Sequence, residues 1–162
     1  MSDTPILRDQ LPSRWRPLYA ILREFERGIE EAYASLGLEG VRPRFSMALM
    51  FLDLAGPMTI RRLATECAVT HSAMSQSVTE MRKAGLVESV PGRDARSRVV
   101  SLTSRGRGVV PILRAEWDAT EAAIADLEDE LPYAPSRLAE DLAEAVRRRS
   151  FADRVRQRMP RA

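Results

Sequence analysis

The chain has 162 residues, of which 44% are hydrophobic and 30% are charged. That length is enough for one domain with a buried core and too short to expect two independent domains. The single cysteine excludes an internal disulfide and a cysteine-based metal cluster. No stretch approaches the roughly 18 uninterrupted apolar residues of a membrane helix, and residues 1–11 lack the apolar centre of a signal peptide. We therefore expect a cytoplasmic protein that does not associate with membranes.

The formal net charge of +2 is unevenly distributed along the chain. Residues 42–107 carry 11 basic and five acidic side chains, whereas residues 108–146 carry two basic and ten acidic ones. A basic block of this kind attracts polyanions such as nucleic acid, which the acidic block would repel. Residues 147–162 add seven basic side chains and one acidic side chain. They form a solvated helix face, a partner for the acidic residues 126–130, or a further nucleic-acid contact.

A long amphipathic helix is predicted near the N-terminus, because apolar residues recur there at alternating spacings of three and four. These residues are Trp15, Leu18, Leu22, Phe25, Ile29, Ala32 and Leu36. Such a seam needs another helix to cover it.

Residues 45–55 are apolar nearly all round, which predicts an enclosed helix that Gly56-Pro57 ends. Asp53 is the exception, and a carboxylate in apolar surroundings needs a partner. It forms an ion pair with a neighbouring arginine, or it is a polar point in an effector pocket. The other candidates for that pocket are Tyr19, Met47, Met50 and Phe51.

Residues 59–84 have the pattern of two short helices joined by a tight turn. Thr59 and Thr70 stand at the two N-cap positions, where a hydroxyl satisfies a free backbone amide. Gly85 follows the second helix at the position of a left-handed C-terminal cap. The apolar face of the second helix, which we expect to pack on the first, consists of Met74, Val78 and Met81.

The opposite face of the second helix carries short, uncharged, hydrogen-bonding side chains. A helix of this kind can enter the major groove of DNA, where Gln76 can pair with adenine through two hydrogen bonds. The alternative is an ordinary exposed helix rich in serine and threonine. The residues that we expect to contact DNA from this helix are Thr70, His71, Ser72, Ser75, Gln76 and Thr79.

A β-hairpin is predicted after the second helix, with strands around Val87 and Val100 and a turn at Pro91-Gly92. Its tip carries Arg93, Arg96 and Arg98, which suit phosphate oxygens or the narrow minor groove. Asp94 is unexpected beside DNA, so we interpret it as organising the wing by fixing Arg96 or Arg98 in a bidentate pair. The alternative is a solvated charged turn.

These motifs resemble the MarR family of bacterial transcription regulators. The resemblance rests on Leu63-Ala64, residues 70–87, Asp94-x-Arg96 and Leu102-Thr103-x-x-Gly106-Arg107. It implies a homodimer that binds a pseudo-palindromic operator in double-stranded DNA, often represses, and is often released by a small aromatic or anionic effector. Pro111 departs from the pattern, because it should kink the long helix after the wing unless that helix begins only at about residue 110.

Two further amphipathic helices are predicted from the spacing of apolar residues, over Leu113–Leu131 and from Leu138 onward. Pro132 and Pro135 separate them, and Phe151 and Val155 extend the last. With the N-terminal helix they form either a dimerisation domain built from both chain ends or an intramolecular bundle. Recognition of two half-sites by two-fold symmetry favours the dimer.

The sequence therefore predicts a mainly α fold with a small β wing, in which a winged helix-turn-helix is joined to a helical dimerisation domain. Its parts are an N-terminal dimerisation helix (1–41), the DNA-binding region (42–107) and C-terminal dimerisation helices (108–162). We predict a repressor that a small molecule relieves. The alternative is a winged-helix protein-interaction module that does not read DNA. We interpret Cys67 as a small core residue rather than a redox switch, and we expect no catalytic residues, metal or cofactor.

Overall fold

The computed structural model describes residues 13–38, 40–91 and 98–160. Arg93, Asp94 and Arg96, which were predicted at the wing tip, lie outside the described residues. The chain divides into two compact units, residues 1–114 and 115–162. The predicted N-terminal helix and DNA-binding region fall within the first unit.

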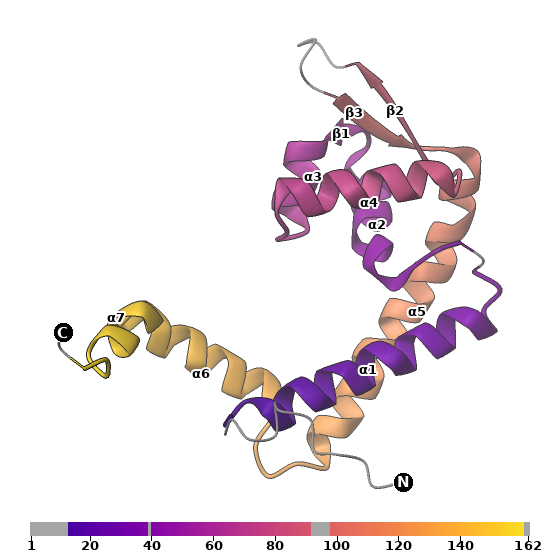
Figure 1. Ribbon diagram of the computed structural model, residues 1–162. Coiled ribbons are helices and arrows are strands. Elements are labelled where there is room, and N and C mark those ends of the chain that lie inside the picture. The colour runs from indigo at the N-terminus through magenta and orange to yellow at the C-terminus, as the bar shows by residue number, and fades with distance from the viewer. Residues whose placement is uncertain (1–12, 39, 92–97, 161–162) are drawn as a thin grey trace, which may run out of the picture. The chain divides into compact units, whose positions relative to one another are not determined.

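The first unit contains helices and a small sheet in the order expected of a winged helix-turn-helix (Figure 1). Its elements are α1 (Arg16–Ser35), η2 (Pro43–Phe45), α2 (Ser46–Ala55), β1 (Met58–Thr59), α3 (Ile60–Glu66), α4 (His71–Lys83), β2 (Val87–Pro91), β3 (Arg98–Leu102) and the beginning of α5 (Ser104–Asp129). The predicted mainly helical chain with a small β wing is confirmed.

The sheet has three antiparallel strands in the order β1-β3-β2. Val87 lies opposite Leu102 and Val90 opposite Val99, which confirms the predicted hairpin. The short strand β1 was not predicted; it pairs with β3 through Met58 opposite Val100. Figure 1 shows the β2–β3 hairpin extending beyond α3 and α4.

The core of the first unit lies where α2, α3, α4 and the sheet meet. Its most deeply buried side chains are Phe45, Leu49, Leu63, Met81, Leu86, Val100, Val110 and Leu113. Helix α2 contributes Leu49 and Leu52 to this core, but Leu54 is 73% exposed. The expectation that α2 is enclosed all round is therefore wrong on one side of the helix.

Helix α5 begins at Ser104, directly after the wing, so Pro111 lies inside it. The alternative start near residue 110 is wrong. The helix begins early because the Thr103 hydroxyl accepts a hydrogen bond from the Gly106 amide at 3.0 Å and so caps the first turn.

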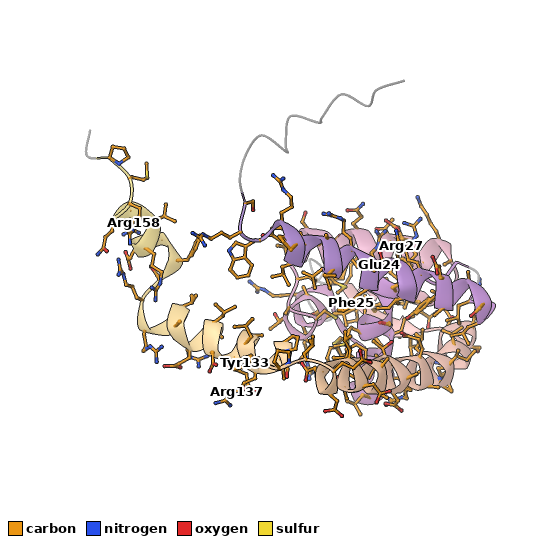
Figure 2. The ribbon with its side chains drawn as sticks, turned by 90° about the horizontal axis from the view of Figure 1, so that it is seen from below. Glu24, Phe25, Arg27, Tyr133, Arg137 and Arg158 are labelled. Carbon is orange, nitrogen blue, oxygen red and sulfur yellow. The ribbon has the colours of Figure 1, made fainter. Side chains whose placement is uncertain are left out.

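The second unit consists of the rest of α5 together with α6 (Pro135–Arg148) and α7 (Phe151–Arg156). The predicted extension of the last helix through Phe151 is wrong, because Ser150 starts a new helix by accepting a hydrogen bond from the Asp153 amide at 3.1 Å. Tyr133, in the turn before α6, donates a hydrogen bond to Asp141 of that helix, and Figure 2 labels Tyr133 and Arg137 in this part of the chain. Within the described part of the chain, no helix has the length and apolar character needed to cross a membrane.

Candidate nucleic-acid interface

The turn between α3 and α4 is fixed by hydrogen bonds of the backbone and of two capping hydroxyls. Thr59 accepts from the Arg62 amide and Thr70 from the Ala73 amide, both at 3.2 Å, which confirms both predicted caps. Ala68 adopts a left-handed conformation with φ of 53°, and the next amide, that of Val69, donates to the Ala64 carbonyl at 3.0 Å. The chain thus reverses within a few residues and sets α4 across α3.

The two faces of α4 differ as predicted. Its apolar residues Met74, Val78 and Met81 are buried. On the opposite face Ser72, Gln76 and Thr79 are exposed and Ser75 is half-buried. Gly85, with φ of 70°, ends the helix in the left-handed region that favours glycine.

The polar residues of α4 differ in the hydrogen-bonding capacity that they have left. The Thr79 hydroxyl donates to the Ser75 carbonyl at 2.9 Å, so its proton is already used. Thr70 is occupied as the N-cap, and His71 is exposed in the first turn. Gln76 offers both an amide donor and a carbonyl acceptor, and it is therefore the best-equipped side chain of this face.

The described part of the wing is held by bonds between its strands. The Arg98 guanidinium donates from Nε to the Ser89 hydroxyl at 3.0 Å and from Nη2 to the Ser89 carbonyl at 2.8 Å. The Ser101 hydroxyl donates to Glu88 at 3.2 Å. Arg98, predicted to contact DNA, thus also fixes the hairpin.

Several bonds attach the end of α4 to the start of α5. The Thr103 hydroxyl is 2.6 Å from the Gly85 carbonyl oxygen, and Arg105 donates to the Ala84 carbonyl at 2.6 Å. Gly106 is buried against Leu86, where a Cβ atom would lie 2.0 Å from the carbonyl oxygen. The Leu-Thr-x-x-Gly motif is therefore a structural joint between the two helices.

An ion cluster that the sequence analysis missed joins α4 to η2 and the residue before it. The Glu80 carboxylate accepts a hydrogen bond from Arg44 and lies 3.3 Å from Nη1 of Arg42. No sequence spacing reveals this cluster, because the partners are 36 or more residues apart.

Three basic side chains of the helix-turn-helix were also absent from the predicted contacts. Arg61, Arg82 and Lys83 are exposed. Arg105 and Arg107, by contrast, donate to backbone carbonyls. The excess positive charge of residues 42–107 was the signal that pointed to such residues.

The five residues predicted for an effector pocket lie on α1 and α2, and none of them lines the cavity described below. Tyr19 is 57% exposed on α1, whereas Met47, Met50 and Phe51 are half-buried on α2. Asp53 is exposed and pairs with Arg114 at 3.0 Å, which confirms the ion-pair interpretation.

A cavity of about 710 Å³ lies elsewhere in the first unit, between the C-terminal half of α1 and the segment that leads to α2. Glu26 and Glu30 contribute acidic groups to its lining, and Arg42 and Arg44 contribute basic ones. Its apolar lining residues are Ile29, Tyr33, Ala34, Leu38, Val41 and Pro43. On α1 outside this lining, Glu24 and Arg27 pair with each other (Figure 2).

Cys67 is half-buried and packs against the core, which confirms the interpretation as a core residue. Burial, and secondarily the charge of Glu66, raise the pKa of the Cys67 thiol above its ordinary value. A raised pKa reduces the fraction of reactive thiolate at neutral pH. Among the described residues, no group of histidine, cysteine or acidic side chains is arranged to hold a metal ion.

Residues 40–97 match the sequence profile of the MarR family, and no curated protein matches the chain. Among solved structures, the transcriptional regulator MOSR of M. tuberculosis in complex with DNA is similar with a TM-score of 0.63 at 21% identity, over 83% of this chain and 93% of that chain. A mutant of MarR from E. coli in complex with operator DNA has a TM-score of 0.64 at 18% identity, over 88% and 99%. A MarR protein from Peptoclostridium difficile has a TM-score of 0.62 at 19% identity, over 94% and 98%. At these identities the likeness shows a shared fold.

Proposed function

We propose that the protein is a MarR-type regulator, whose profile residues 40–97 match, and that it binds a pseudo-palindromic DNA operator as a homodimer, represses transcription, and is released by a small molecule. The observation that carries this proposal is the exposed polar face of α4 with Gln76 at its centre, in a winged helix-turn-helix whose described strands include Arg98. The MOSR and MarR structures that contain DNA have the same fold.

The DNA contacts that we propose fall into two classes. Gln76, with Ser72 and Ser75, would contact base edges in the major groove, because these side chains both donate and accept hydrogen bonds. The wing arginines, including Arg98, would contact phosphates or the minor groove and so fix the register without selecting a sequence.

Dimerisation is supported by large apolar side chains that remain exposed within one chain. On α1, Leu18, Leu22 and Phe25 are each at least 40% exposed. In the second unit the exposed apolar residues are Trp117, Ile124, Leu127, Leu131, Leu138, Leu142 and Val146. Apolar stripes of this extent are typical of surfaces that a partner covers, and a second copy would supply the second reading helix.

The cavity beside α1 supports an effector with an apolar body, since its volume lies in the range of small-molecule sites. Arg42 and Arg44 in its lining can pair with a carboxylate, and Glu26 and Glu30 can pair with an amine. Benzoate and 4-(aminomethyl)benzoate are therefore matched probes. We expect the second to bind more tightly and to weaken operator binding, and substitution of Glu30 by glutamine to remove that difference.

DNA binding is tested by selecting bound fragments from random DNA with the purified protein and then titrating the best fragment with salt. We expect a preferred, inverted-repeat site whose affinity falls steeply as salt rises, because phosphate contacts release counterions. A protein-interaction module would select no site and show no such dependence.

A further inference from the structure

Glu80 ties the recognition helix α4 to residues 40–45, which lead from α1 to α2. Its carboxylate is shared by Arg44, which donates a hydrogen bond to it, and by Arg42 at 3.3 Å. The Glu80 side chain is 25% exposed, whereas those of Arg42 and Arg44 are 61% and 50% exposed. The carboxylate is therefore the shielded centre of the cluster, and the three charges sum to a positive value.

Gly40 lies close to Ala84, the residue at the C-terminal cap of α4. A Cβ atom at Gly40 would lie 3.7 Å from the Cβ of Ala84, which follows Glu80 by four residues. Residues four apart share one face of a helix. Residues 40–45 therefore pair with α4 at Glu80 and lie close to its C-terminal cap at Ala84.

Arg44 is itself held in place by the core. The Phe45 ring is 1% exposed, and the Arg44 guanidinium carbon lies 5.5 Å from the centre of that ring. A cation at this distance is attracted to the aromatic face. The guanidinium that binds Glu80 is therefore held against a buried aromatic side chain.

The position of Glu80 on α4 gives the cluster its relevance to DNA. Glu80 follows Gln76 by one helical turn and adjoins Thr79, so it flanks the reading face. A carboxylate there would repel phosphates if it had no partner. Because it is paired with two arginines, the carboxylate can instead hold α4 in one rotation about the helix axis without repelling the phosphates.

We propose that Glu80 is a positioning residue for DNA recognition, which acts through Arg42 and Arg44 to hold α4 in the orientation that lets Gln76 read a base. The inference rests on the proposed function. It assigns no DNA contact to Glu80 itself, and it gives residues 40–45 a part in orienting α4.

Two explanations of Glu80 predict opposite effects of Glu80→Gln. A carboxylate that merely repels DNA would, when neutralised, strengthen binding to operator and random DNA alike and free two arginines for phosphates. A positioning carboxylate would, when neutralised, weaken operator binding relative to random DNA. The ratio of the two affinities at fixed salt separates a change of orientation from a change of charge.

The experiment measures operator and random-sequence affinities by fluorescence anisotropy for the full-length wild type, Glu80→Gln and a control, Glu66→Gln. Glu66 pairs with Arg62 at 3.4 Å on the same helix, α3, so the control removes the same charge without separating two elements. We expect Glu80→Gln to lower the affinity ratio about three- to fivefold, the size of a partly exposed ion-pair effect. The control should leave the ratio unchanged.

A charge exchange completes the test. Arg44→Glu and Glu80→Arg should each lower the ratio, and the double variant should recover part of it, because the pair is restored in reverse while Arg42 stays unpaired. Thermal unfolding checks that every variant is folded. A ratio that Glu80→Gln leaves intact, or losses that simply add in the double variant, overturns the inference alone. A wild type with no preference for any site overturns the proposed function and this inference with it.

Discussion

Gly106 lies so close to Leu86 that a Cβ atom would fall 2.0 Å from the Leu86 carbonyl oxygen and 3.2 Å from Cδ2 of Leu102. This contact packs the first turn of α5 against the chain that leaves the recognition helix. It explains physically why a glycine ends the Leu-Thr-x-x-Gly motif.

Gly106→Ala is expected to destabilise the protein by about 1–3 kcal/mol or more, because backbone rather than a flexible side chain must move. Gly108→Ala is the matched control on the same helix, since a Cβ there would meet nothing within 4 Å. It should stabilise by about 0.4–1 kcal/mol, because alanine loses less backbone entropy on folding. Urea unfolding of both variants measures the difference, and similar stabilities would contradict the close packing.

Ala68→Gly is expected to stabilise the turn of the helix-turn-helix. Ala68 has φ of 53°, a conformation that costs a residue with a Cβ about 1–2 kcal/mol. Part of the relief is lost to the greater freedom of glycine in the unfolded chain, so we expect a gain of up to about 1 kcal/mol. Ala20→Gly, at an exposed position inside α1, should instead destabilise by about 1 kcal/mol. A lower melting temperature for Ala68→Gly would be inconsistent with strain at this turn.

Gln76→Ala is expected to cost about 1–3 kcal/mol on the preferred operator and to relax the preference at one base pair. Lys83→Ala provides the contrast, because an exposed cation at the end of α4 should weaken binding to all sequences and reduce the salt slope by about one. Competition assays with operators altered at single positions distinguish the two variants. If Gln76→Ala weakens operator and random DNA equally, Gln76 has no reading role.

Leu22→Arg combined with Ile124→Arg is expected to give monomers or unfolded chain and to abolish operator binding. Leu22 is 46% exposed and Ile124 38% exposed within one chain, and arginine at a covered apolar seam would bury an unpaired charge. Sedimentation should give twice the chain mass for the wild type. A wild-type monomer at micromolar concentration, or tight operator binding by the double variant, would refute the dimer.

Local signals in the sequence predicted most of the reading unit. The caps Thr59 and Thr70, the C-terminal Gly85 and the apolar face of α4 depend on neighbours a few residues away, so their spacing was sufficient. The two strands of the hairpin followed in the same way.

Features that depend on residues far apart in the chain were not predicted from the sequence. Strand β1 has two residues and exists because β3 offers it an edge. The cluster at Glu80 joins residues that only folding brings together, and the cavity beside α1 is lined by residues of α1 and of the segment that leads to α2. Ser150 is an N-cap residue that the sequence shows, but the apolar spacing of Leu142, Val146 and Phe151 indicated one continuous helix instead.

The residues that line the two sides of the cavity beside α1 differ in how freely they can be substituted. Arg42 and Arg44 on one wall also hold Glu80, so substitutions there would disturb α4 as well as any bound molecule. Glu26 and Glu30 on the other side lie on α1 and do not take part in that cluster. If the cavity holds the proposed effector, substitutions on α1 would change which molecules the protein answers to while leaving the proposed operator preference intact.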